Sequence, residues 1–377
     1  MAYETEDHEI QYCFPAINSS CIKENRSSYD YSLLYMFFSL LSASTVFLNL
    51  LVVISISHFK KLHTPTNLII LSLAVADMLV GLIIMPIQAI KLIETCWYFG
   101  DTFCRLFMLI MGLLLSASLS NLVLIAIDRF VAVCHPLQYP QKITIIRMLF
   151  IVCLCWFVSS AYNIAIVINI SHRTDVCYGE CIIMLTFKWR IIDLIFSFLF
   201  PCTLIITLHL RIFYIAQKQV KVINSLMKSG KCVMEGSVRR KSESKAALTL
   251  GIIVAIHLLC WIPYYILTLT ENTAIPPTIL YCLIWVFYVN SCVNPLIYAL
   301  FYPWFRKSIK YILTLRIFQP ASSRSCLNVS RENAPDMNRM FYMCFFFFIA
   351  ISMDCVSEPA GDYLNLSIQQ VSHCNPP

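Results

Sequence analysis

Hydrophobic residues along this chain gather in seven long segments, which short polar stretches separate. Each segment is long enough to cross the hydrocarbon core of a bilayer, because about 20 helical residues span that distance. The segments cover roughly 31–57, 65–90, 102–134, 146–170, 189–215, 246–270 and 277–301. The pattern therefore predicts an all-α membrane protein, built as a seven-transmembrane helix bundle.

The composition agrees with this pattern, because 59% of the 377 residues are hydrophobic and only 13% are charged. A soluble domain has about 25% charged residues. The formal net charge of +7 is typical of many nucleic-acid-binding proteins. Here, however, the basic residues lie in loops rather than in a basic patch interleaved with aromatic residues. We therefore expect membrane lipid, and no nucleic acid, as a partner.

Basic residues mark alternate loops of the predicted bundle. They occur in HFKKLHTPTN after the first segment, in the long linker after the fifth and beyond the seventh. The linker and the last stretch contain Lys218, Lys221, Lys228, Lys231, Arg239, Arg240, Lys241, Arg306, Lys307 and Lys310. The other loops carry less positive or mixed charge, so the positive-inside rule places the N-terminus outside the plasma membrane and the C-terminus inside.

The N-terminal tail is polar and starts with acidic residues. It contains the sequons of Asn18 and Asn25, which are glycosylation sites in an extracellular tail. The tail lacks a basic region followed by an apolar core, so we expect no cleavable signal peptide. The predicted domains are this extracellular tail at 1–30, a membrane domain at 31–315 and a disordered cytoplasmic tail at 316–377.

Two shorter apolar stretches follow the seventh segment. In residues 301–313, apolar positions recur at helical spacing opposite basic residues. This spacing predicts a short amphipathic eighth helix on the inner membrane surface. Residues 341–352 are apolar but too short to span a bilayer. We hypothesise that the chain beyond about residue 335 comes from a misread splice junction, which a transcript without this tail would support.

Asp77 lies in the middle of the second segment, where a charged residue is costly and by default functional. Oxygen-bearing side chains of other segments can reach it in a bundle, among them Asn49. Such ligands suit Na⁺ or a water-filled polar network. The alternative is a purely structural network; we favour a Na⁺ site coupled to a switch and expect no other cofactor. The residues of this site are Asp77, Ser118, Asn290, Ser291 and Asn294.

Asp128 and Arg129 stand at the inner end of the third segment. Arg129 cannot lose its proton and needs a carboxylate there. One candidate is the adjacent Asp128, and the other is Glu243 at the start of the sixth segment. A breakable Arg129–Glu243 pair would hold two helices together in a resting state. The alternative is an arginine that extends along the membrane edge toward water.

Asp193 lies in the fifth segment, about two helical turns outward of Pro201. Arg190, about one turn further out, is close enough to neutralise it. Alternatively, Asp193 faces a cavity and binds a cationic ligand, because a carboxylate in a low-dielectric pocket attracts an ammonium group strongly. Aromatic residues of later segments either offer cation–π faces or simply pack. They are Trp261, Tyr264, Tyr265, Trp285 and Tyr288.

Four prolines lie within the predicted spans: Pro86, Pro201, Pro263 and Pro295. Each removes a backbone hydrogen bond and kinks its helix, which opens cavities and provides hinges. The sequence lacks the HExxH, GxSxG and P-loop motifs of enzymes and the inverted repeats of transporters. We therefore expect a conformational switch and not an enzyme.

Motif residues occur in all seven segments. They are Asn49, Asp77, Asp128-Arg129-Phe130, Trp156, Pro201, Cys260-Trp261-Ile262-Pro263 and Asn294-Pro295-Leu296-Ile297-Tyr298. Together they resemble the rhodopsin-like G-protein-coupled receptors over residues 31–315. The seventh segment up to Phe305, KLHTPTN and CWYFGD further resemble the trace amine-associated receptors. The resemblance implies a set of switch and coupling residues, which is Asp128, Arg129, Glu243, Pro263, Pro295 and Tyr298.

The resemblance also implies disulfides among the outer cysteines. The implied pairs are Cys104 with Cys181, Cys13 with Cys177, and Cys21 with Cys96. The first would fix the long outer loop over the third helix, and the second would tie the N-terminal tail to that loop. Each bridge contributes about 2–4 kcal/mol to stability.

Amine receptors of this class usually hold the ligand ammonium with an Asp on the third helix, about five turns above the arginine of the Asp-Arg pair. That position is Met111, which cannot pair with an ammonium. A fish-type group, which the chain resembles, places the Asp on the fifth helix, where Asp193 stands. The resemblance thus implies an inverted pocket for amine odorants. Its residues are Asp193, Met111, Trp261, Tyr264, Tyr265, Thr268, Trp285 and Tyr288.

The resemblance finally implies an olfactory receptor in the cilia of sensory neurons. Ligand binding shifts an inactive–active equilibrium, and a stimulatory or olfactory G protein docks inside and raises cyclic AMP. Arrestin and a receptor kinase are further implied partners. Phe130, His209 and His257 replace the residues usual at the switch, which leaves basal activity open. The alternatives are a receptor for a non-amine ligand, with Asp193 paired to Arg190, and a transporter.

Overall fold

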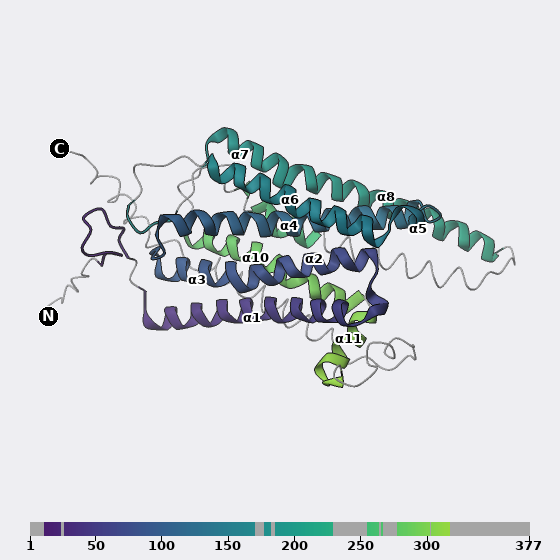
Figure 1. Cartoon of the computed structure of the whole chain (residues 1–377), viewed down its shortest axis with the longest axis horizontal. Coiled ribbons are helices and arrows are strands. Elements are labelled where there is room, and N and C mark those ends of the chain that lie inside the picture. The colour runs from purple at the N-terminus through teal and green to yellow at the C-terminus, as the bar shows by residue number, and fades with distance from the viewer. Residues whose placement is uncertain are drawn as a thin grey trace, which may run out of the picture. The chain divides into compact units, whose positions relative to one another are not determined.

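The structure is a computed structural model of helices joined by loops (Figure 1). It describes residues 11–23, 26–169, 177–181, 185–228, 255–263, 265–266, 277–301 and 303–316. These residues fall into two compact units. The first holds the described parts of Met1–Ile256 and Ser291–Val329, and the second holds those of His257–Asn290.

Five helical stretches within the described ranges are long and apolar enough to cross a membrane. They are α1 (Ser28–His58), the α2–α3 helix (Pro65–Glu94), α4 (Gly100–Cys134), α6 (Ile145–Ile168), and Phe187–Lys218 from α7 and α8. α10 (Pro277–Phe301) occupies the seventh predicted segment, and the described residues 255–263 and 265–266 of the sixth are helical. The hydrophobic pattern thus predicted the membrane helices correctly.

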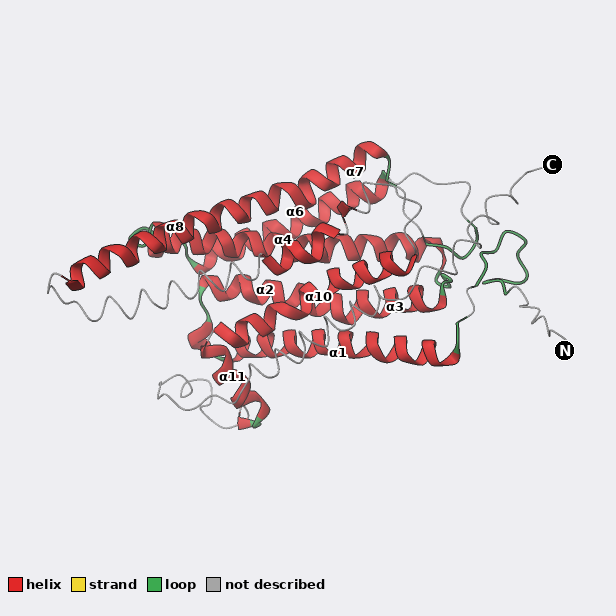
Figure 2. Ribbon diagram, turned by 180° about the vertical axis from the view of Figure 1, so that it is seen from behind, coloured by secondary structure: helices red, strands yellow, loops and turns green. Residues whose placement is uncertain are grey.

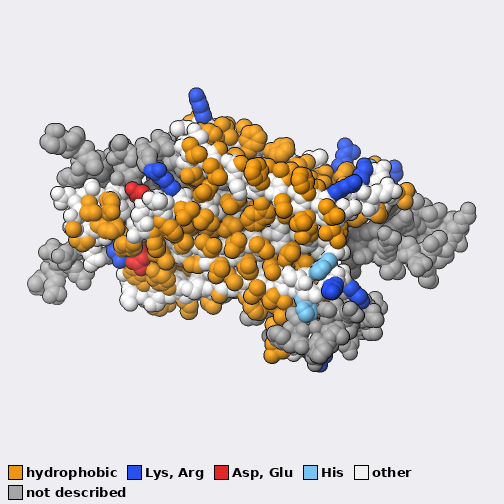
Figure 3. Space-filling view, in the orientation of Figure 1, with side chains coloured by type: hydrophobic (Ala, Val, Ile, Leu, Met, Phe, Trp, Pro, Cys, Tyr) orange, Lys and Arg blue, Asp and Glu red, His pale blue; other side chains and the backbone are white. Residues whose placement is uncertain are grey.

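Within the first unit, α4 is the central helix. It packs against α2, α6 and α8, while α1 packs against α2 and α3. Figures 1 and 2 show these helices running side by side from opposite views. On the face shown in Figure 3, hydrophobic side chains cover the middle of the helices, and charged side chains lie toward the two ends. This distribution suits a bilayer around the middle of the unit.

Threonine and proline residues determine where α2 begins. The Thr64 hydroxyl accepts a hydrogen bond from the Asn67 amide, which satisfies one of the first free N–H groups of the helix. Pro65 occupies the first helical position, where no amide hydrogen is needed. Thr144 caps α6 in the same way by accepting from the Arg147 amide. These local signals determine where α2 and α6 begin. Both helices begin at the end of the first unit where α4 ends.

Two spans contain a π-helical turn that ends two residues before a proline. Val80–Ile84 separates α2 (Pro65–Leu79) from α3 (Met85–Glu94), and Ile195–Leu199 separates α7 (Phe187–Leu194) from α8 (Phe200–Lys228). Pro86 and Pro201 follow these turns. A proline lacks the amide hydrogen and its ring collides with the carbonyl four residues back. The wider turn relieves that collision, and π-turns are frequent at functional sites.

Two helical stretches lie beyond the predicted spans, the last part of α8 and the whole of α11 (Pro303–Leu313). α8 continues to Lys228, so the linker predicted to begin after residue 215 is wrong at its start. The stretch AQKQVKVINSLMK contains good helix formers without proline or glycine, which lets the helix continue past the apolar segment. α11 confirms the predicted short eighth helix. It packs on α1, with the Phe59 and Tyr311 rings 6.4 Å apart.

Candidate functional site

Asp77 lies at the centre of a buried polar network in the first unit. Its side chain is 0% exposed. The Ser118 hydroxyl of α4 donates to Asp77 Oδ1 at 2.9 Å, and the Asn294 amide of α10 donates to Oδ2 at 2.8 Å. Both carboxylate oxygens are therefore bound by neutral donors from other helices. Ser118 and Asn294, which were predicted to reach Asp77, thus contact it directly.

The other predicted members of this network have different positions. Asn49 of α1 donates to the backbone carbonyls of Thr45 (2.9 Å) and Ser291 (3.0 Å), so it links α1 to α10 beside the site. Ser291 is buried in the first unit, and its side chain is a further hydrogen-bond partner of Asp77. Asn290 is buried and belongs to the second unit. Polar side chains of α4 and α10 thus meet at one buried carboxylate of α2, and the carboxylate and hydroxyl oxygens among them suit a small hard cation.

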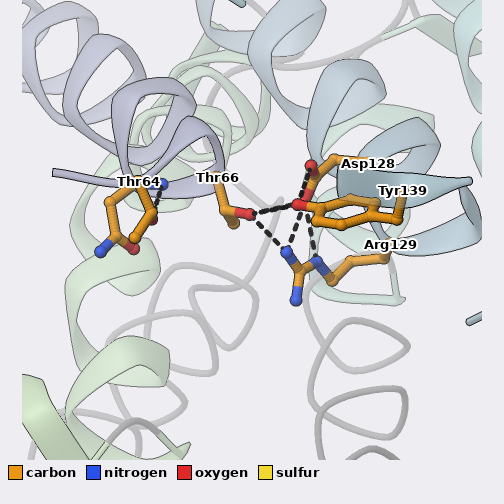
Figure 4. A network of polar contacts seen from close by, with 6 residues as sticks. Thr64, Thr66, Asp128, Arg129 and Tyr139 are labelled. Atoms are coloured by element: carbon orange, nitrogen blue, oxygen red, sulfur yellow. Dashed lines mark hydrogen bonds and ion pairs between the residues drawn. The ribbon is translucent and has the colours of Figure 1, made fainter. Parts of the chain in front are cut away.

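Asp128 and Arg129 form a second network at the opposite end of α4 from Cys104 (Figure 4). The Arg129 guanidinium forms an ion pair with Asp128 Oδ2, and its Nε donates a hydrogen bond to that oxygen at 3.0 Å. The Thr66 hydroxyl of α2 donates to the same oxygen at 2.8 Å. The Tyr139 hydroxyl of α5 (Tyr139–Lys142) donates to Oδ1 at 2.8 Å. Every acceptor oxygen of this carboxylate is in use.

The structure shows one of the two partners predicted for Arg129. The adjacent Asp128 is its observed carboxylate partner, and Arg129 also donates to the Thr66 hydroxyl. Glu243, the other candidate, lies outside the described residues. Burial raises the pKa of the Tyr139 hydroxyl, so this group remains a protonated donor at neutral pH. The Asp128 side chain is 0% and the Arg129 side chain 22% exposed, which gives a buried anion with a partly wet cation.

Asp193 forms a third polar cluster, on α7 and half-buried. The Tyr162 hydroxyl of α6 donates to Asp193 Oδ1 at 2.8 Å, and the Ser197 hydroxyl reaches the same oxygen at 2.7 Å. Ser197 lies in the π-turn that follows α7. The polar contacts of Asp193 within the described ranges come from these hydroxyls and not from Arg190. The Arg190 guanidinium lies over the Phe187 ring, 5.8 Å from its centroid.

The other predicted pocket residues divide between the two units. Met111 lies on α4 in the first unit and is half-buried. Tyr264 and Thr268 lie outside the described residues. In the second unit, the Trp261 ring stacks on Tyr265 (centroids 6.0 Å apart) and packs on Phe287 (4.2 Å). Trp285, Tyr288 and His257 likewise make ring contacts there, so aromatic packing accounts for much of this stripe.

The remaining switch residues are helical. Pro263 lies in the described helical stretch 255–263 of the second unit. Pro295 lies inside α10. Tyr298 is buried one turn further along α10, in the first unit.

Three disulfides join the N-terminal segment, the loop after α3, the start of α4 and residues 177–181 at one end of the first unit, called here the disulfide end. They are Cys13–Cys96, Cys21–Cys177 and Cys104–Cys181, with Cα–Cα distances of 5.7, 5.0 and 5.8 Å. The last pair confirms the prediction. The predicted Cys13–Cys177 and Cys21–Cys96 pairs are wrong, because these four cysteines exchange partners.

Backbone hydrogen bonds explain the exchange. The Cys21 amide donates to the Tyr178 carbonyl at 3.0 Å, which aligns Cys21 beside Cys177. The Cys13 amide donates to the Cys21 carbonyl at 2.9 Å, so the segment doubles back and leaves Cys13 next to Cys96. All four cysteines pack in one cluster. The register of the backbone therefore decides the pairing, which sequence spacing cannot do.

Glu94 ties the N-terminal segment to the helices. The Lys23 ammonium donates to Glu94 Oε2 at 3.0 Å, and the Tyr35 hydroxyl of α1 donates to Oε1 at 2.8 Å. The hydrogen bond with Glu94 raises the pKa of Lys23. Lys91 of α3 donates to the Cys181 carbonyl. The disulfide end is thus held by α1, α3, α4 and the N-terminal segment together.

Reasoning from sequence did not identify the hydroxyl groups that surround two of the carboxylates. These partners are Thr66 and Tyr139 for Asp128, and Tyr162 and Ser197 for Asp193. Only Ser197 had a usable signal, because it lies four residues after Asp193 on the same span and therefore on the same face. The other three lie on different helices from the carboxylates that they contact.

Comparisons with known proteins place this architecture in a family. The model of the 7 transmembrane receptor (rhodopsin family) matches residues 48–298, more than half of the chain. Trace amine-associated receptor 13c of Danio rerio is 40% identical over 324 residues, which cover 83% of this chain and 95% of that protein. Trace amine-associated receptor 1 of Homo sapiens is 37% identical, with 84% and 97% covered.

A third relative extends the same result. Trace amine-associated receptor 9 of Rattus norvegicus is 39% identical over 333 residues, which cover 84% of this chain and 98% of the relative. The match covers the spans that carry Asp77, Asp128 and Asp193. The chain therefore belongs to the rhodopsin family of seven-transmembrane receptors, which are not enzymes, and within it to the trace amine-associated receptors.

Proposed function

We propose that this receptor binds small amines and that the Asp193 carboxylate holds the ligand ammonium. The observation that carries the proposal is that half-buried Asp193 has two neutral hydroxyls as its described polar partners. A carboxylate in such surroundings attracts an ammonium group strongly, because low dielectric strengthens their interaction. The names of the relatives, trace amine-associated receptors, also support an amine.

The third helix supplies an apolar surface in this proposal. Met111 of α4 is half-buried and offers no charge. The apolar part of the amine therefore points toward α4, while the ammonium points toward α7. Amine odorants are the ligands that suit such an inverted pocket.

Ligand binding shifts an equilibrium between inactive and active arrangements of the helices. A receptor of this family has a small-molecule ligand and a G protein as its partners. The network of Thr66, Asp128, Arg129 and Tyr139 joins α2, α4 and α5, so it stabilises the inactive arrangement until it opens. The G protein is of the stimulatory or olfactory type and raises cyclic AMP. Arrestin and a receptor kinase end the signal.

Asp77 holds Na⁺ in the inactive arrangement. Its donor set fits this ion, since the Asp77 carboxylate and the Ser118 hydroxyl offer oxygen atoms in a fully buried place. Exchanging Na⁺ for N-methylglucamine at constant ionic strength should lower the agonist EC50 of the wild type by about fivefold or more. The Asp77→Asn variant should not respond to the exchange. Equal responses of both proteins would contradict the Na⁺ site.

In this proposal the receptor lies in the plasma membrane of olfactory cilia, with the disulfide end outside. Disulfides persist in an oxidising, extracellular environment. Asn18, a sequon residue of that end, is exposed, as a glycan acceptor must be. Asn25 lies outside the described residues.

A cyclic-AMP reporter screen of an amine panel on the wild type and on Asp193→Ala tests the ligand proposal. The wild type should respond, and Asp193→Ala should lose the response at matched surface expression. Asp101→Ala is the matched control, because it removes an exposed carboxylate at the start of α4. A wild-type response to neutral ligands alone, or an unchanged amine EC50 in Asp193→Ala, would contradict the proposal.

A further inference from the structure

The contacts of Asp193 are asymmetric between its two oxygens. Tyr162 and Ser197 both approach Oδ1, at 2.8 and 2.7 Å, and the two hydroxyl oxygens lie 3.1 Å from each other. Within the part of the chain that the structure describes, these hydroxyls do not bond Oδ2. An ionised carboxylate has about four acceptor sites on two oxygens. The two hydroxyls therefore hold one oxygen and leave the other to further donors.

The other two carboxylates of the bundle are bound differently. Asp77 accepts hydrogen bonds on both oxygens. Asp128 accepts from Tyr139 on Oδ1 and from Arg129 and Thr66 on Oδ2. Asp193 is thus the one of these three whose described donors converge on a single oxygen.

The Tyr162 hydroxyl comes from a well-fixed part of α6. The neighbouring Asn163 is buried, and its amide donates to the Ser116 hydroxyl of α4 and to the Ser159 carbonyl, both at 2.8 Å. Ser116 in turn donates to the Gly112 carbonyl at 2.6 Å. A Cβ atom at Gly112 would lie only 2.1 Å from Asn163 Oδ1, so this close approach of α4 and α6 requires glycine.

We propose that Tyr162 is a positioning residue, which together with Ser197 clamps Oδ1 of Asp193 and so presents Oδ2 to the ligand. This inference rests on the proposed amine-binding function of Asp193. A fixed Oδ2 favours an ammonium that can donate an N–H to it, because a charge-assisted hydrogen bond depends on distance and direction. Protonated primary, secondary and tertiary amines meet this requirement. Quaternary ammonium compounds do not, since they carry no N–H.

The test compares hydroxyl removal at two tyrosines in the full-length receptor. The probes are isopentylamine, cyclohexylamine and 2-phenylethylamine, each with its N-trimethylated analogue. Tyr162→Phe should raise the EC50 of the primary amines about tenfold, the effect of one hydrogen bond to a charged group. Tyr35→Phe is the matched control, because its hydroxyl also donates to a carboxylate, that of Glu94. It should leave the EC50 within about twofold of the wild type.

The preference for N–H donors separates positioning from a merely structural role. A loss of packing would raise the EC50 of primary and trimethylated amines by the same factor. If Tyr162→Phe releases the Asp193 carboxylate, the EC50 of the primary amine should rise more than that of its trimethylated analogue. The ratio of the trimethylated EC50 to the primary-amine EC50 should therefore fall. An EC50 of the primary amines within about twofold of the wild type, or an unchanged ratio, would overturn the inference.

Two further variants, Ser197→Ala and Asp193→Ala, test the proposal if Tyr162→Phe does not fold or does not change the response. If Tyr162→Phe fails to reach the cell surface, Ser197→Ala removes the other donor and should give the same change in the ratio. The Asp193→Ala variant distinguishes the two proposals. If it keeps its amine response, the proposed function fails; if it loses the response while Tyr162→Phe behaves like the wild type, only the positioning role fails.

Discussion

Asp128 and Asp193 are both carboxylates inside the helical bundle, but their surroundings differ. Asp128 is fully buried, carries an arginine partner and has donors on both oxygens. Asp193 is half-buried, and the donors described for it are two neutral hydroxyls on one oxygen. A saturated, charge-paired carboxylate stabilises one arrangement of helices. A carboxylate without a paired cation is suited to receive one from a ligand.

The difference follows from the elements that surround each residue. Asp128 is adjacent to Arg129 in sequence, and α2 and α5 bring hydroxyl groups to it (Figure 4). Asp193 lies next to a π-turn that precedes Pro201, on the side of α7 that faces Tyr162 of α6. Removing the Asp128 carboxylate should therefore change basal signalling, whereas removing the Asp193 carboxylate should change ligand potency.

The largest expected effect is that of Asp193→Ala on amine potency. Losing one desolvated ammonium–carboxylate contact costs about 2–5 kcal/mol, which raises the EC50 about 30-fold to several thousand-fold. Dose–response curves in the cyclic-AMP assay, at equal surface expression, measure this shift. Basal signalling should stay at the wild-type level. A change in basal signalling without a change in potency would reverse the roles assigned to the two carboxylates.

A smaller effect is expected for Asp128→Asn, and it should appear in the absence of ligand. Asparagine keeps an acceptor oxygen for Tyr139 but removes the charge that pairs with Arg129. The inactive arrangement loses about 1.5–3 kcal/mol, the range for a hydrogen bond to a charged group, so basal cyclic AMP should rise. Thr66→Val, which removes one neutral donor, should raise it less. Unchanged basal signalling in both variants would show that this network does not restrain the receptor.

The smallest effect is expected for Met111→Asp, which adds a carboxylate across the proposed pocket from Asp193. A diamine could then pair at both ends, and its EC50 should fall about tenfold, or ~1.4 kcal/mol. Monoamines should gain little or lose potency, because their apolar part would meet a charged group. Met111→Asn has the same shape without the charge and serves as the control. An equal gain for diamines in the Asn variant would rule out the electrostatic explanation.

At the disulfide end, the sequence was enough to identify the bridged cysteines but not all of their pairings. The six cysteines that form bridges were identified correctly, and the Cys104–Cys181 pair was predicted correctly. The other two pairs were exchanged, because all four cysteines lie in one cluster and either connection is spatially close. Only the hydrogen bonds of Cys13 and Cys21 fix the register that separates the two possibilities.

The sequence by itself determined the class of fold, the positions of the membrane spans and the family. Hydrophobic segment length, loop charge and short motifs are local properties, and they can be read without knowing how the helices pack. The tertiary structure alone decided which hydroxyl groups reach Asp128 and Asp193, and on which oxygen. Apart from the contact of Ser197, which lies four residues after Asp193, those contacts depend on the distances and rotations of separate helices, such as α6 and α7, and no local pattern encodes them.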